Sequence, residues 1–199
     1  GTPAGQVAHP DTLPETGWVA AAVPGTVASA LKLPLDGAAE LDAKDWWFRC
    51  RVQVPAEGRW RLVFQGLATI TEGWLNGASC FRSRNMFRQV RVELPAGAGE
   101  YELAVVFRAL APELAARRPR PRWKTALVDH QNLRWFRTSL HGRIPAWTPP
   151  LPAVGPWRSV NLERIDGPGL HNVVVVGFLA NDVPRLRFSA RAEGVPPGE

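Results

Sequence analysis

Residues 46–54 have the sequence WWFRCRVQV, in which apolar and polar side chains alternate. In an extended strand the even-numbered residues from 48 to 54 would lie on one face and the odd-numbered ones on the other. This pattern predicts a half-buried strand, which is typical of an antiparallel sheet with one face on the core. Cys50 falls on the apolar face, so a buried free thiol is favoured over a disulfide with Cys80.

The same period of two recurs along the chain, between short segments rich in turn residues. The Asn76-Gly77 pair is the strongest two-residue hairpin signal, because both central residues of a type I′ turn need positive φ. With 19 prolines and 18 glycines the chain is too interrupted for a helical protein. The predicted fold class is therefore all-β, a sandwich or a barrel. Further strands are expected at 60–65, 67–75, 86–94, 101–107 and 157–165.

The N-terminal part of the chain has a different character. Residues 1–17 mix Gly, Pro, Thr and Ala without a period, which predicts an irregular N-terminal arm. A turn at Pro24-Gly25 follows, and Thr26 is placed to cap a short helix that runs through Leu31.

A domain boundary is predicted at residues 166–169, which read Asp-Gly-Pro-Gly. Two strands follow at 172–178 and 185–192, and two strands do not bury a core by themselves. We interpret residues 166–199 as the start of a second β-domain, with a hairpin docked on the first domain, residues 18–165, as the alternative.

Composition excludes several classes of protein. The chain has 199 residues, is 45% hydrophobic and carries a formal charge of +6, which is typical of a folded globular protein. Charges or prolines interrupt every apolar run before it reaches the ~20 residues of a membrane span, so no membrane partner is expected. No signal peptide is visible after Gly1, and a cytoplasmic and a periplasmic location both remain open.

The middle of the chain is basic. Residues 82–143 hold twelve arginines and one lysine against five acidic residues. Arginine interleaved with tryptophan is what single-strand binders use. These arginines are mixed with prolines and large apolar residues, however, and arginine also pairs and stacks inside interfaces. No nucleic-acid partner is expected.

No catalytic or metal-binding constellation stands out. The four histidines are scattered and neither cysteine has a CxxC partner, so we expect no metal and no cofactor. Glycoside hydrolysis would need two carboxylates across the scissile bond. Glu72 is the one carboxylate in the middle of an apolar run, and we interpret it as an exposed residue of an edge strand. We therefore expect no catalytic residue within this chain.

Tryptophan is unusually frequent, with nine in the chain. An indole ring offers a flat apolar face to a pyranose and an N–H to a hydroxyl. Four tryptophans on expected strands are assigned to the core: Trp46, Trp60, Trp74 and Trp157. Three others lie in the long segment without a period, residues 109–156, and are candidates for sugar contact: Trp123, Trp135 and Trp147.

Five motifs together carry a resemblance to a known family. In chain order they are DWWFR at 45–49, LVFQGLAT at 62–69, WLNG at 74–77, NMF at 85–87 and VGPWRSVNLE at 154–163. Over residues 18–165 the chain resembles the N-terminal sugar-binding domain of glycoside hydrolase family 2, in its β-mannosidase-like branch. The resemblance implies a jelly-roll, galactose-binding-like β-sandwich followed by the first strands of an immunoglobulin-like sandwich. It also implies a later (β/α)₈ barrel that carries the family's two catalytic glutamates, and a barrel alone takes ~250 residues.

The sequence departs from the family at two aspartate positions. The family's Trp-Asp-Trp-Gly-Pro stretch, which reaches into the active site, aligns with residues 145–149 and has Ala146 in place of its aspartate. The family's Gly-Leu-Asp-Thr has Ala68 here. Trp147 and Asn85 are the matched positions that the resemblance places near a sugar.

These observations lead to one hypothesis and two alternatives. The hypothesis is a non-catalytic module that shapes an active-site wall and supports the barrel of an enzyme that hydrolyses O-glycosyl bonds. Its expected partners are a carbohydrate, the immunoglobulin-like domain and the barrel. The alternatives are a freestanding carbohydrate-binding module and an interaction module without a sugar site.

Overall fold

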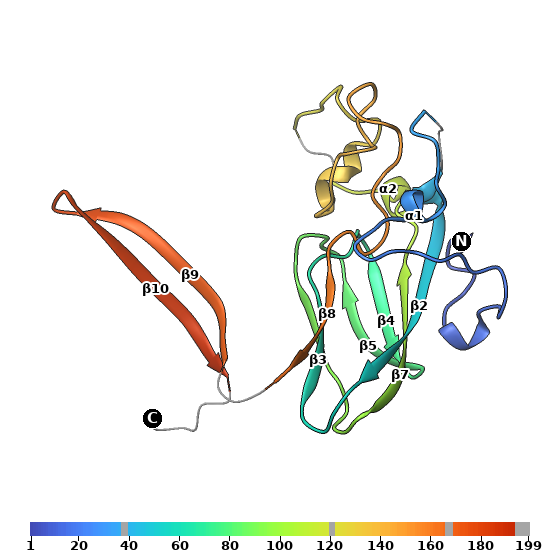
Figure 1. The fold of residues 1–199 in the computed structure, drawn as a ribbon. Coiled ribbons are helices and arrows are strands. Elements are labelled where there is room, and N and C mark those ends of the chain that lie inside the picture. Colours follow the sequence, from blue (N-terminus) through green and yellow to red (C-terminus); the bar gives the residue numbers. More distant parts are fainter. Residues whose placement is uncertain (37–39, 120–121, 166–168, 194–199) are drawn as a thin grey trace.

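The computed structural model describes residues 1–36, 40–119, 122–165 and 169–193. Within these residues two antiparallel sheets face each other in the main body (Figure 1). The larger sheet has five strands in the order β1 (Thr2–Pro3), β2 (Lys44–Val54), β7 (Gly99–Phe107), β4 (Thr71–Leu75) and β5 (Ala78–Ser83). The smaller sheet has three: β6 (Val90–Glu93), β3 (Trp60–Phe64) and β8 (Val160–Arg164). The predicted all-β sandwich is confirmed.

The main core lies between the two sheets. From β3 it receives Leu62 and Phe64, and from β7 it receives Leu103, Val105 and Phe107, all of them buried. These residues alternate with outward-facing ones along each strand, so the period of two in the sequence reports the inner face directly. Burial of large apolar side chains contributes about 1.5–3 kcal/mol each and stabilises the pairing of the sheets.

Two local predictions from the N-terminal half are confirmed. The helix α1 (Val27–Ala30) begins after Thr26, whose hydroxyl accepts a hydrogen bond from the Ser29 N–H. Asn76 and Gly77 turn the β4–β5 hairpin with φ values of 47° and 76°. Both features are decided by residues close in sequence, which is why the sequence predicts them well.

The position of Glu72 was predicted wrongly. Its strand β4 lies between β7 and β5 and is not an edge strand. The Glu72 carboxylate accepts a hydrogen bond from the Arg108 guanidinium at 2.8 Å, and the same guanidinium binds the buried Asp45 at 2.8 Å. Arg108 comes directly after β7 and lies 36 residues from Glu72 in sequence, so no local pattern could reveal the ion pair.

The strand expected from residue 157 begins at Val160, and two others also begin later than predicted. The strand expected from residue 67 begins at Thr71, and Ala68 instead forms an isolated bridge with Gly155. The strand expected from residue 86 begins at Val90, and Met86 is buried in the preceding loop. In both cases an apolar residue is buried by distant contacts rather than by a place in a sheet.

The irregular segment 109–156, which we call the loop layer, lies over one end of the sandwich (Figure 1, yellow to orange). It contains the helix α2 (Ala111–Ala115) and the 3₁₀ turn η3 (Gln131–Trp135). Other 3₁₀ turns are η1 (Pro10–Thr12) and η2 (Leu41–Ala43). A second small core joins the loop layer to the sandwich: it is made of Ile70, which precedes β4, and of Leu110, Leu114, Leu133 and Phe136.

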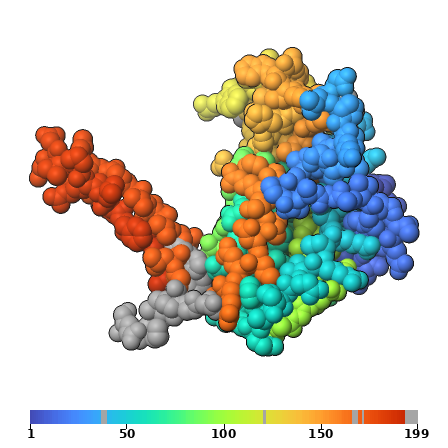
Figure 2. Space-filling model, in the orientation of Figure 1, coloured from blue at the N-terminus to red at the C-terminus, as the bar shows by residue number. Residues whose placement is uncertain are grey.

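The last described residues form a hairpin of β9 (Gly169–Ala180) and β10 (Val183–Glu193), turned at Asn181 and Asp182. It extends away from the sandwich in Figure 1 and in the space-filling view of Figure 2. Of the predicted boundary at 166–169, only Gly169 falls within the described residues. No helix in the described part of the chain has the length and apolar character to cross a membrane.

Both cysteines, which lie in described residues, are free thiols as predicted. Cys50 was expected to be buried, and this is wrong: its side chain is exposed. The cysteine does lie on the inner face of β2, but the sandwich is open at that side and leaves it at the wall of a cavity.

Candidate functional site

The loop layer is fixed to the rest of the protein by a buried arginine. The Arg143 guanidinium donates to both carboxylate oxygens of Asp42 at 2.7 Å, and to the Ser139 carbonyl at 2.8 Å. A bidentate pair of this kind fixes orientation as well as distance. It joins segments 101 residues apart, so the loops at this end of the sandwich form a defined surface.

The loop around Met86 is held between the loop layer and the sandwich. Its N–H donates to the Arg137 carbonyl at 3.0 Å, and its carbonyl accepts from the Trp157 indole N–H at 2.9 Å. Gly66 lies against both groups: a Cβ there would be 2.7 Å from the indole nitrogen and 2.9 Å from the Met86 carbonyl. A side chain at position 66 would therefore separate Trp157 from this loop.

Asn85 precedes Met86 in this loop and is half-buried. Its side-chain oxygen accepts a hydrogen bond from the Phe87 N–H at 3.0 Å. Within the described residues its side-chain nitrogen has no hydrogen-bond partner, so two N–H donors remain for a ligand. Phe87 is exposed next to it and meets the Trp157 ring edge-on at 6.0 Å. Sequence reasoning missed Phe87, although its place in the NMF motif was a signal.

The three candidate tryptophans are all exposed, by 61% for Trp123, 47% for Trp135 and 74% for Trp147. The Arg134 guanidinium lies 4.2 Å from the centre of the Trp123 ring and covers one of its faces. Trp147 makes no ring stacking or cation–π contact within the described residues. Its ring is therefore the most available of the three for stacking on a ligand.

The predicted site residues make no direct contact with one another among the described hydrogen bonds and ring contacts. No hydrogen bond or ring contact in the described part of the chain links any two of Asn85, Trp123, Trp135 and Trp147. They lie on the loop layer or, for Asn85, in the loop before β6.

The two alanines at family aspartate positions have opposite environments. Ala68 is fully buried and exchanges two backbone hydrogen bonds with Gly155, at 3.0 and 3.2 Å. Ala146 is exposed next to Trp147, with a φ of 62° in the left-handed region. Among residues with a side chain, Asn and Asp adopt this conformation most readily, so the backbone conformation at Ala146 is energetically unfavourable.

Several arginines of the basic middle segment pair with carboxylates within the fold. Arg84 and Arg118 both donate to the Glu113 carboxylate at 2.9 Å. Together with the pairs of Arg108 and Arg143, these contacts place the positive charge beside carboxylates. Nothing in this arrangement indicates a nucleic-acid surface.

A hollow of about 440 Å³ lies under the loop layer, beside η2. Its lining includes Asp42, Asp129 and His130, but Asp42 is already bound by Arg143 and would have to leave that pair to act as an acid or nucleophile. Within the described residues no three His, Cys, Asp or Glu side chains are grouped to hold a metal ion.

Two facing antiparallel sheets with a loop layer across one end define an all-β sandwich domain. The chain belongs to the family described as the glycosyl hydrolase 2 galactose-binding domain-like domain, whose sequence model matches residues 6–158. The resemblance seen in the sequence motifs is thus confirmed.

Two curated relatives match the chain over two thirds or more of its length. Beta-mannosidase B of Emericella nidulans is 30% identical over 174 residues, which cover 80% of this chain and 20% of that protein. Beta-mannosidase B of Aspergillus terreus is 32% identical over 147 residues, covering 67% and 17%. The chain therefore spans about a fifth of the length of these curated relatives.

Solved structures give the same fold. The β-D-mannosidase from Dictyoglomus thermophilum matches with a TM-score of 0.69 and 25% identity, over 91% of this chain and 24% of that one. A GH2 β-galacturonidase from Eisenbergiella tayi matches with a TM-score of 0.56 at 18% identity, over 94% of this chain and 28% of that one. The second likeness shows the fold alone.

Proposed function

We propose that residues 18–165 are the non-catalytic N-terminal module of a β-mannosidase-like, family 2 glycosidase. The module would shape one wall of the active site and support a catalytic barrel that lies elsewhere in the protein. The observation that carries this proposal is the match to the family over residues 6–158, combined with relatives named as β-mannosidases of which the chain covers about a fifth.

Trp147 is the group we assign to sugar contact. Its exposed ring offers a flat apolar face to a pyranose, and no side chain in the described residues stacks on it. The free N–H groups of Asn85 are suited to donate to a sugar hydroxyl or ring oxygen. Trp123 and Trp135 are weaker candidates, since Arg134 covers one face of Trp123 and Trp135 is only half exposed.

The alanine at position 146 bears on specificity. A carboxylate beside Trp147 would accept a hydrogen bond from one sugar hydroxyl, and an alanine has no acceptor. Loss of a polar partner of this kind weakens discrimination between sugars that differ at that hydroxyl. We therefore propose that the enzyme is less selective for mannosides than the family pattern implies.

The hairpin β9–β10 is assigned to the next domain. Its valines and leucines are exposed on both faces, which suits strands that another sheet covers. We propose that residues 166–199 are the beginning of an immunoglobulin-like sandwich.

The test compares the 199-residue chain with the full product of its gene on aryl β-mannoside and aryl β-galactoside. We expect no turnover by the 199-residue chain and hydrolysis by the full product. In the full product, Trp147→Ala should lower kcat/KM by about 10- to 100-fold, since one stacked ring contributes on the order of 1–3 kcal/mol. Leu35→Ala, at an exposed apolar side chain that is not a candidate for sugar contact, is the control and should change kcat/KM less than about twofold.

Turnover by the 199-residue chain, abolished by a substitution within it, would refute the proposal. Titration of the same chain with mannose and manno-oligosaccharides separates the alternatives. Binding at about millimolar or tighter affinity that is lost in Trp147→Ala would favour a freestanding carbohydrate-binding module. A full product without glycosidase activity or sugar binding would favour an interaction module.

A further inference from the structure

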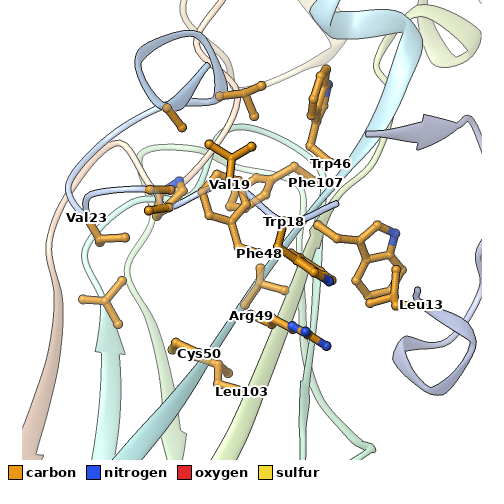
Figure 3. A pocket seen from close by; sticks show the side chains of 18 of the residues that line it. Leu13, Trp18, Val19, Val23, Trp46, Phe48, Arg49, Cys50, Leu103 and Phe107 are labelled. Atoms are coloured by element: carbon orange, nitrogen blue, oxygen red, sulfur yellow. The ribbon is translucent and has the colours of Figure 1, made fainter. Parts of the chain in front are cut away.

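The sandwich is open along one side, between β2 of the larger sheet and β8 of the smaller one. A cavity of about 910 Å³ lies there, and Figure 3 shows Phe48, Cys50 and Leu103 on its wall with Trp18 and Val19 above them. Val160 and Leu162 of β8 line it from the other sheet. Residues of the N-terminal segment from Leu13 to Leu31 line it as well, together with Arg49 and Arg51 on the other face of β2. The cavity is therefore an incompletely filled, open side of the core that this segment partly covers.

The hydrogen bonds of β8 show which way its backbone groups point. The Gln65 N–H donates to the Ser159 carbonyl at 3.0 Å, and the Ile165 N–H donates to the Arg59 carbonyl at 2.8 Å. In an antiparallel pair the bonded residues alternate, so the odd-numbered residues from 159 to 165 bond to β3. The N–H and C=O groups of Val160 and Leu162 therefore point to the outer edge.

That outer edge has no partner strand in the described residues, since β8 is last in the order β6–β3–β8. No backbone hydrogen bond from Val160 or Leu162 to another segment is found within those residues either. The opposite rim is different: the Arg49 side chain donates to the Glu15 carbonyl at 3.3 Å and lies 4.3 Å from the Trp18 ring. The N-terminal segment thus reaches the β2 rim, and its Gly25 and Val27 N–H groups bond to the Pro156 and Val154 carbonyls just before β8. Within the described residues none of its backbone groups bonds to Val160 or Leu162.

We infer that this side of the sandwich receives one extended polypeptide strand, with apolar side chains at alternate positions, that pairs with the outer edge of β8. Its backbone would bond to Val160 and Leu162, and every second side chain would enter the cavity. A lipid or other apolar molecule would fill the space but leave those backbone groups unsatisfied. We assign this strand to another part of the same protein, outside residues 1–199, because the chain spans only 17–24% of the relatives' lengths.

The alkylation rate of Cys50 shows whether the cavity is occupied. This cysteine is exposed on the cavity wall, while Cys80 lies on β5 and does not line the cavity. Desolvation raises the pKa of both thiols, so alkylation of either one speeds up as the pH is raised toward its pKa. Cys80 therefore serves as an internal reference for Cys50 in the same molecule.

The experiment adds an acetylated, amidated peptide of sequence KVTVTVTVK to the 199-residue chain and measures alkylation by iodoacetamide at alkaline pH. We expect the peptide to slow alkylation of Cys50 by about tenfold and to leave Cys80 unchanged, because an occupied site must open before the reagent enters. Amide exchange at Val160 and Leu162 should slow as well.

Two controls test strand pairing rather than apolar contact. Val160→Pro removes an N–H that β3 does not use, and proline is tolerated on an edge strand at such a position. The variant should fold with an unchanged circular dichroism spectrum and lose the protection of Cys50. The same peptide with N-methyl groups on its valines needs no protein variant and should also fail to protect.

Three results would overturn the inference. One is an unchanged rate at Cys50 with saturating peptide. Another is equal protection by the N-methylated peptide, which would show apolar binding without strand pairing. The third is protection that appears without peptide as the protein concentration is raised, together with a dimer in sedimentation, which would make a second copy the occupant.

Discussion

The sandwich and the β9–β10 hairpin share the same local structure, but their apolar side chains differ in how far they are buried. Each contains antiparallel strands with apolar residues, and each has a two-residue turn that begins with an asparagine at positive φ, Asn76 in one and Asn181 in the other. Phe64 in the sandwich is 1% exposed, whereas Phe188 in the hairpin is 60% exposed. Local pairing makes a ribbon, but only a second sheet gives it a core.

The largest expected effect comes from a matched pair of phenylalanine substitutions. Phe64→Ala should lower the free energy of unfolding of the sandwich by about 3–5 kcal/mol, because it leaves a cavity between the sheets. Phe188→Ala should change it by less than about 0.5 kcal/mol. Urea unfolding followed by tryptophan fluorescence measures both. Equal effects would mean that the hairpin is packed on the sandwich.

A second prediction concerns Asp45, a buried aspartate of the sandwich. Asp45 accepts hydrogen bonds from Arg108 at 2.8 Å and from the Ala109 N–H at 2.7 Å. Asp45→Asn should cost about 3 kcal/mol, because it breaks a buried ion pair, while Glu72 still compensates part of the Arg108 charge.

The control for this substitution is Asp11→Asn, at an exposed aspartate that pairs with His9 at 3.3 Å. A surface pair of this kind contributes little, so the change should stay within about 0.5 kcal/mol in the same urea experiment. A cost at Asp45 no larger than at Asp11 would contradict the role of the buried pair.

The smallest effects concern the two turns. Gly77 has a φ of 76°, so Gly77→Ala should destabilise the β4–β5 hairpin by about 1 kcal/mol. Asp182 has a φ of 60° without being glycine, so Asp182→Gly should stabilise the β9–β10 hairpin by about 0.5–1 kcal/mol. Amide hydrogen exchange within each hairpin measures the two changes, and two changes of the same sign would refute this reading of the turns.

The strands were predicted well because their signals are local. Alternation marked β2, β3 and β7, and the asparagine–glycine pair fixed one hairpin. Met86 could not be placed, because it is buried by contacts with Arg137 and Trp157, 51 and 71 residues away. Glu72 was assigned to an edge for the same reason: the order of strands in a sheet is not written in any one segment.

The candidate site was predicted only in part. The exposure of Trp123, Trp135 and Trp147 followed from their place outside the periodic segments. The cover of Trp123 by Arg134 and the exposed ring of Phe87 beside Asn85 did not, because both depend on how loops fold over the sandwich. The role of these residues toward a sugar stays a prediction.

The sequence by itself determined the all-β class, the inner faces of β2, β3 and β7, the Asn76-Gly77 turn and the family. Each of these depends on the spacing of side chains over a few residues or on motifs in order. The tertiary structure alone decided that Asp45, Glu72 and Arg108 form one charged network, and that Cys50 on an inner face is nonetheless exposed. Burial depends on what packs against a strand from elsewhere in the chain, whereas a period of two shows only which face of the strand is apolar.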